Sequence, residues 1–271
     1  MTANRISAGE GARWLLDGLR VLRKAPLQLM LLHLAFLFAV ALLLALPAIG
    51  FAIFWLLTPA LLIGPHAAVR AAAQGRAPGF PLIVEGFRGA FAALVRLGLV
   101  FVLALFVALG ATALADDGQL FRAMLGIQKL RLEDLFKPEL HQALLVWAVL
   151  ETAVLSVLWY APLLVAWQGV PAAKSVFFST AAIVLNWRAM LAFGGAMLIA
   201  LFAVSFLALL LASLVARTEQ ARILSAGFAA TWTLLPILFA ASWRSYEAIF
   251  GGPPPGGGTA APARDTGSEA D

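Results

Sequence analysis

The sequence contains no cysteine among its 271 residues. Disulfide bonds, thiolate metal sites and cysteine nucleophiles are therefore excluded, whereas the redox state of the compartment stays open. Histidine is scarce as well, with three residues in the chain, and the two shortages together disfavour a metal cage. Nucleotide-binding loops, zincin pairs, nucleophile elbows and paired-carboxylate sites are also missing. We expect no metal, no cofactor and no enzymatic activity.

Charged residues are few. They make up 12% of the chain, where a soluble domain has about 25%, and hydrophobic residues make up 62%. Runs of about 20 nearly uncharged residues recur, which is the length that crosses roughly 30 Å of hydrocarbon. The composition therefore predicts an all-α fold, a polytopic membrane helix bundle whose first partner is the lipid bilayer.

The net charge of +5 does not indicate a nucleic acid as partner. Lys and Arg stand singly beside apolar runs and form no basic block. They are typical of topology signals at membrane boundaries. Other membrane proteins stay open as partners, and the sequence says nothing of the oligomeric state.

Hydropathy predicts six transmembrane helices, with both termini on one side. We place the spans near residues 27–46, 50–69, 97–115, 143–167, 189–214 and 223–242. The side of the termini holds 13 of the 19 Lys and Arg residues, so the positive-inside rule places both termini in the cytoplasm. A cleaved signal peptide is the alternative for the first run, but residues 27–69 continue as two spans back to back.

Residues 11–26, GARWLLDGLRVLRKAP, predict an amphipathic helix ahead of the first span. We expect it to lie in the membrane interface, where its basic residues meet anionic headgroups. A cap packed on the bundle is the alternative. At the mouth of the fifth span, residues 186–188 form a second polar cluster that suits anchoring at the boundary, or a headgroup contact. The candidate interface residues are Trp14, Arg20, Arg23, Lys24, Arg88, Asn186, Trp187 and Arg188.

Short internal similarities predict three copies of one unit. LLDGLR at 15–20, IVEGFR at 83–88 and IVLNWR at 183–188 each precede an odd-numbered span. Each even-numbered span carries a Trp three or four residues before a Pro. We therefore expect three helical hairpins, starting near residues 8, 80 and 173, within one transmembrane domain of residues 1–250. The prolines, Pro59, Pro162 and Pro236, are candidate hinges or fixed kinks.

Two segments lie outside the predicted spans. The outer loop, residues 116–142, mixes apolar and charged residues, and we expect one or two interfacial helices there. A lid over the bundle is the first interpretation and a ligand site the second. Residues 251–271 are rich in Gly and Pro and predict a disordered cytoplasmic tail.

Glu151 and His33 are the candidate functional polar residues within the membrane. Glu151 is the one carboxylate inside a predicted span, roughly 14 Å from its start. A buried acid suggests a proton relay, although hydrogen bonds to neighbours explain it as well. His33 suits a neutral residue hydrogen-bonded between helices, or a relay member. His66, beside Gly64 and Pro65, is expected at the interface.

The order of three segments resembles an uncharacterised family of bacterial six-span inner-membrane proteins. They are ARWLLDGLRVLRKAP at 12–26, LLTPALLIGPHAAVRAAAQGRAPGF at 56–80 and WYAPLLVAWQGVPAAKSVFFSTAAIVLNWRAM at 159–190. The resemblance covers about residues 8–248 and implies a multipass protein of the bacterial cytoplasmic membrane, without catalytic residues to carry over.

Function is open between three classes. A non-enzymatic structural or envelope-associated protein is favoured, because a solute path needs polar groups and the spans hold few. The alternative is a transporter or channel for a small solute or lipid that uses Glu151 and proline-kinked helices. An enzyme acting on lipid would need clustered acid, base or metal ligands, and the sequence offers none.

Overall fold

The structure is a computed structural model that describes residues 3–46 and 49–251. Within these residues the regular elements are all helices, as expected. The predicted tail lies outside the described residues from residue 252 onward. The elements are α1 (Ala8–Leu22), α2 (Pro26–Leu44), α3 (Ile49–Leu61), α4 (Ile63–Ala73), the 3-10 helix η1 (Phe80–Phe87), α5 (Phe91–Ala111), α6 (Ala113–Asp116), α7 (Gln119–Met124), the 3-10 helix η2 (Leu132–Phe136), α8 (Pro138–Leu158), α9 (Ala161–Gln168), α10 (Ala172–Leu185), α11 (Trp187–Val215) and α12 (Glu219–Phe250).

Six helical runs of the described chain are long and apolar enough to cross a membrane, which confirms the six predicted spans. The sixth continues well beyond residue 242, where the hydropathy prediction ended it. Its last two turns carry polar residues, but they stay helical because they pack inside the bundle. The runs are Pro26–Leu44, Ala52–Ala73, Phe91–Asp116, Pro138–Gln168, Trp187–Val215 and Glu219–Phe250.

The three prolines of the even-numbered spans affect their helices differently. Pro59 lies inside α3, two residues before that helix ends. Pro162 lies in the first turn of α9, where a missing N–H costs nothing, and it follows a break between α8 and α9. Pro236 lies inside α12, which runs through it without interruption. Whether any of them acts as a hinge stays a prediction.

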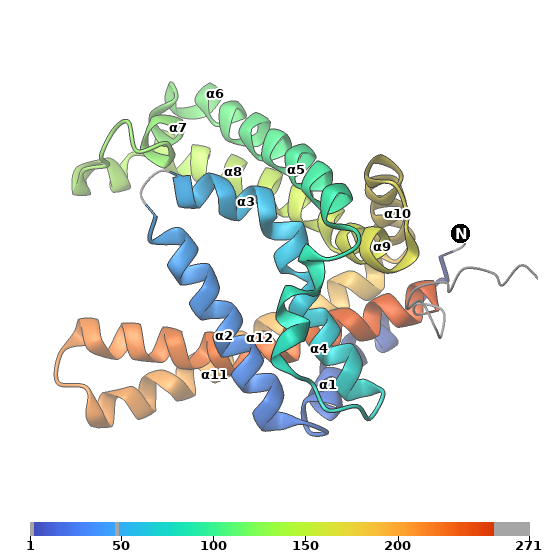
Figure 1. Cartoon of the computed structure of the whole chain (residues 1–271). Helices are drawn as coiled ribbons and strands as arrows, with labels where there is room; N and C mark the ends of the chain where they lie inside the picture. Colours follow the sequence, from blue (N-terminus) through green and yellow to red (C-terminus); the bar gives the residue numbers. More distant parts are fainter. Residues whose placement is uncertain (1–2, 47–48, 252–271) are drawn as a thin grey trace, which may run out of the picture.

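The first and last described segments of the chain meet at one end of the bundle. The backbone N–H of Asn4 donates to the carbonyl of Ile249 over 2.9 Å, and we call this the terminal end. Figure 1 shows the α5–α8 and α11–α12 connections at the opposite end, which we call the loop end. A short helix (α1, η1 or α10) precedes each pair of spans, while the internal repeat itself stays a prediction.

Helix α1 packs between α11 and α12 and does not present its apolar face to lipid. Trp14 is 3% exposed and meets the ring of Phe193 edge-on at 6.0 Å. Gly11 and Gly18 on the same face allow this docking, because a Cβ at Gly11 would lie 2.1 Å from the carbonyl oxygen of Ala189. The placement of Trp14 at the lipid interface was therefore wrong, and the alternative of a packed cap is the one observed.

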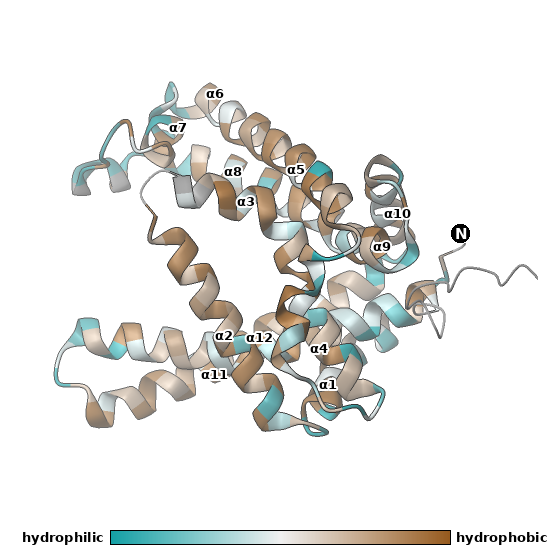
Figure 2. Cartoon of the chain, viewed as in Figure 1, coloured by the Kyte–Doolittle hydropathy of each residue, from teal (hydrophilic) through white to brown (hydrophobic). Residues whose placement is uncertain are grey.

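Apolar side chains are distributed unevenly between the two ends. Buried clusters gather around Tyr160 and Tyr246, and around Phe239 and Trp243, at the terminal end. Helix α11 is the most apolar of the six runs, yet its most apolar 18-residue stretch has no residue buried in the chain. Figure 2 shows the apolar residues along α2, α3 and α5 and the hydrophilic ones around α7.

Candidate functional site

The break between α8 and α9 places Tyr160 at the centre of a buried polar cluster. A helix that begins anew has backbone N–H groups without an intrahelical partner, and the N–H of Tyr160 donates to Ser179 Oγ at 3.1 Å. The Tyr160 hydroxyl donates to Ser245 Oγ at 3.0 Å. The tyrosine is fully buried. Helices α9, α10 and α12 are therefore joined at this point by side-chain hydrogen bonds.

A second group of polar contacts lies beside Tyr160. Gln168 Nε2 donates to the hydroxyl of Tyr246 at 2.6 Å. The guanidinium of Arg70 lies 5.1 Å from the ring centre of Trp167, a cation–π contact, and the indole N–H of Trp167 donates to Glu85 at 3.3 Å. These residues come from α4, η1, α9 and α12, so the contacts tie four segments of the chain together.

Two buried histidines pack their rings against the ring of Phe239. The ring centre of His33 lies 5.2 Å and that of His66 4.8 Å from the ring centre of Phe239. Each Nδ1 is close to the carbonyl four residues earlier, at 2.7 Å for His33 and 2.8 Å for His66. The neutral rings therefore carry the proton on Nδ1. His33 bonds within its own helix, so the expected bond between helices is not seen.

The second ring nitrogens of these histidines differ. His66 Nε2 lies 3.2 Å from the hydroxyl of Ser242, which donates to it. His33 Nε2 is buried without a hydrogen-bond partner among the described residues. The expectation that His66 lies at the interface was wrong, since it is 5% exposed. It is buried because α4 packs against α12 at this point.

Glu151 lies near the middle of the Pro138–Gln168 run and is half-buried. It makes no hydrogen bond or ion pair with the part of the chain that the structure describes, and His33 bonds elsewhere, to Leu29. Within the described residues, Glu151 and His33 therefore make no hydrogen bond or ion pair with each other. A role in proton movement stays a prediction.

Asn186 is a buried clamp on the N-terminal segment. Its Oδ1 accepts from the N–H of Ile6 at 2.7 Å, and its Nδ2 donates to the carbonyls of Asn4 and Ala182, each at 3.0 Å. It is 2% exposed, so its assignment to lipid headgroups was wrong. An amide offers donors and an acceptor together, which is what the end of α10 and the passing chain require.

The remaining interface candidates lie on the surface. Trp187 is 53% exposed, and the guanidinium of Arg188 lies 5.2 Å from its ring centre. Lys24 donates to the carbonyl of Ala73 at 2.8 Å. The other exposed basic candidates are Arg20, Arg23 and Arg88. Their contact with headgroups stays a prediction.

The tyrosine cluster was missed from the sequence. The chain has two tyrosines, and both lie in this cluster with their ring centres 6.4 Å apart. A tyrosine in an apolar span needs a partner for its hydroxyl, which was the available signal. Ser245 is 85 residues from its partner Tyr160, and Gln168 is 78 residues from its partner Tyr246, so spacing in the sequence did not reveal either pair.

Comparison with known proteins places the chain among membrane proteins. It is 30% identical over 258 residues to a probable inner membrane protein of Burkholderia thailandensis, and the match covers 93% of this chain and 94% of the relative. The chain belongs to the same family. This membership confirms the resemblance seen in the sequence and makes the protein a multipass membrane protein. No protein-family model matches the chain, and no solved structure matches it significantly.

Proposed function

We propose that the protein is a non-enzymatic membrane protein with a structural or envelope-associated role in the bacterial cytoplasmic membrane. The observation that carries the proposal is the closure of the polar side chains on one another at the terminal end. Tyr160 bonds to Ser245 and Gln168 bonds to Tyr246, with aromatic rings packed around them. A solute path needs polar groups that are free to bind what passes.

The exposed apolar surface of α11 and α12 supports contact with lipid or with other membrane proteins. Phe202, Phe206 and Leu214 are among the side chains of α11 that are more than 60% exposed. Bilayer lipid satisfies such a surface without any further partner. The proposal therefore needs no soluble ligand.

The orientation is part of the proposal. The basic residues are concentrated at the terminal end, which is the end expected to face the cytoplasm. The loop end, with α6, α7 and η2, then faces the outside. This arrangement follows from the charge bias and is open to direct labelling.

A transporter or channel is the second candidate, and Glu151 is the observation that favours it. A half-buried carboxylate near the middle of a span, without a described partner, is costly unless water or an ion reaches it. Movement at the α8–α9 break beside Pro162 would couple that site to the terminal end.

Water access at position 151 separates the two functions. The chain has no native cysteine, so Glu151→Cys is labelled alone with a membrane-impermeant thiol reagent applied from each side. Val149→Cys is the matched control, because Val149 lies on the same helix at nearly the same depth and is 67% exposed. Lys129→Cys in the outer loop is the positive control.

We expect the Lys129→Cys variant to react from outside and both positions in α8 to stay protected. Glu151 is only half-buried within the protein. Protection of a cysteine at position 151 from the thiol reagent would therefore mean that lipid, and not protein, covers this position. Labelling at position 151 but not 149 would overturn the structural role in favour of transport. Labelling of Lys129→Cys only from the cytoplasmic side would overturn the orientation.

A further inference from the structure

A polar pocket of about 430 Å³ lies at the loop end, where η2 and the segment before it face α6 and α7. Its lining consists of four bases, three acids and two glutamines. Small-molecule sites occupy about 300–1,000 Å³ and are mostly apolar. The size of the loop pocket therefore suits a small ligand, and its lining suits a charged one.

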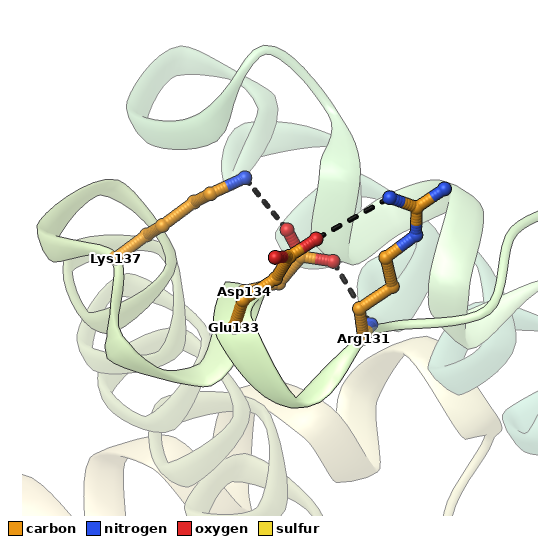
Figure 3. A network of polar contacts seen from close by, with 4 residues as sticks. All are labelled: Arg131, Glu133, Asp134 and Lys137. Carbon is orange, nitrogen blue, oxygen red and sulfur yellow. Dashed lines mark hydrogen bonds and ion pairs between the residues drawn. The ribbon is translucent and has the colours of Figure 1, made fainter.

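Hydrogen bonds from the backbone hold two of the acids. Asp116 accepts from the N–H groups of Gly118 at 3.0 Å and Leu120 at 2.6 Å. Asp134 accepts from the ammonium of Lys137 at 2.6 Å and from the N–H of Arg131 at 2.9 Å, as Figure 3 shows. The Lys137 ammonium, with the Arg131 N–H, lowers the pKa of Asp134 to about 2. The Asp134 carboxylate therefore stays charged, and the ammonium of Lys137 already balances that charge.

The third acid, Glu133, pairs with a base as Asp134 does, which leaves two of the four bases without an acidic partner among the described residues. Glu133 pairs with Arg131 at 3.3 Å. Arg122 donates only to neutral oxygens, the carbonyl of Asp117 at 3.0 Å and Gln128 Oε1 at 3.2 Å. Lys129 is exposed and has no hydrogen bond or ion pair within the described residues. In the described chain, Arg122 and Lys129 thus pair with no carboxylate, while Asp116 is held by backbone N–H groups alone, so four bases against three acids leave the lining with a net charge of +1.

The wall that carries Arg122 is fixed before any ligand arrives. Asp117 and Gly118 have positive φ angles of 51° and 78°, a conformation that glycine adopts freely and aspartate more readily than most other residues. The carboxylate of Asp116 holds it here, and the Arg122 guanidinium clasps the same turn. A preformed site loses little conformational entropy on binding.

We propose that the loop pocket binds a small phosphate-bearing anion, with Arg122 and Lys129 as its cationic ligands. Arginine presents a planar fork of donors and lysine a point charge, and the two together suit a phosphate group. The phosphate belongs either to a soluble ester or to a phospholipid headgroup at the adjacent membrane surface.

Calorimetry of the full chain in neutral detergent tests the soluble source, with glycerol 3-phosphate as the probe. Lys129→Gln removes one cation and disturbs no contact within the described chain. Lys174→Gln is the matched control, since Lys174 is exposed on α10 at the terminal end. We expect tenfold weaker binding in the first variant and unchanged binding in the second, with weakening of wild-type binding by salt.

The second arm measures how many phosphatidylglycerol molecules stay bound to the chain after extraction from mixed vesicles of phosphatidylglycerol and phosphatidylcholine. Binding in the calorimeter alone indicates a soluble ester, and retention lost in Lys129→Gln but not in Lys174→Gln indicates a headgroup. Either result supports the loop pocket as an anion site. Absence of both signals, or signals that Lys129→Gln leaves unchanged, overturns it.

Discussion

Replacing Gly11 by alanine tests how closely α1 approaches α11. The added Cβ would lie 2.1 Å from the carbonyl oxygen and 2.6 Å from the Cα of Ala189, whereas carbon–oxygen contacts normally lie at about 3.3 Å or more. Both obstructing atoms belong to the backbone, so no rotamer change relieves the overlap. The two helices must separate by roughly 1 Å, which also loosens the packing of Trp14 on Phe193.

The cost follows from two opposing contributions. Overpacking costs about 1–3 kcal/mol, and alanine regains up to about 1 kcal/mol in helix propensity. Gly9 is the matched control, because it lies in the same helix and a Cβ there would meet nothing within 4 Å. We expect Gly11→Ala to be less stable than Gly9→Ala by about 2 kcal/mol, which is roughly thirtyfold in the unfolding equilibrium.

The assay is denaturation in mixed detergent micelles, followed by tryptophan fluorescence. If the two variants agree within about 0.5 kcal/mol, α1 does not lie in the groove between α11 and α12. A destabilised Gly9→Ala would equally contradict the reasoning, since the structure leaves open space at that position.

Three further predictions concern hydrogen bonds. Asn186→Ala leaves the Ile6 N–H without its acceptor, so we expect the free energy of unfolding to fall by about 1–3 kcal/mol and amide exchange in residues 3–7 to become faster. Unchanged exchange would contradict the clamp. Tyr160→Phe removes the hydrogen bond to Ser245, so we expect the free energy of unfolding in the fluorescence assay to fall by about 1 kcal/mol. An unchanged free energy of unfolding would show that this hydrogen bond contributes nothing to stability. Asp134, whose folded pKa is about 2 against about 3.9 unfolded, stabilises the loop above pH 4, and this stability is lost as the pH falls toward 2. At pH 4, pepsin should therefore cut residues 113–137 faster in Asp134→Asn than in the wild type, whose carboxylate is still ionised at that pH; equal cutting rates for the two chains would refute this.

The spans were predictable because membrane crossing is a local property of composition. Twenty apolar residues in a row need no knowledge of neighbours, and all six runs were found in this way. Pro162 was a candidate kink, and a helix break does lie beside it, but the same signal at Pro236 lies within a helix that continues unbroken. For the spans, the physical cause lies within one segment of the sequence.

The candidate site was less predictable, because its contacts join distant segments. An apolar helix face looks the same whether lipid or another helix covers it, so Trp14 was assigned to the wrong neighbour. The role of Asn186 depends on Ile6, which is 180 residues away in the chain. Serines such as Ser245 carry no sign of their partner until the helices are assembled.

The docking of α1 has a consequence for biosynthesis. Helix α1 leaves the ribosome before α11 and α12, so the groove into which it packs does not exist until those two helices have been made. At about 5–20 residues per second, the 180 residues between Ile6 and Asn186 take roughly 10–40 s to synthesise. During that interval the apolar face of α1 needs another cover, and its exposed basic face suits the surface of the bilayer. The amphipathic helix would then be an interfacial element while the protein is being made and a core element once it is finished.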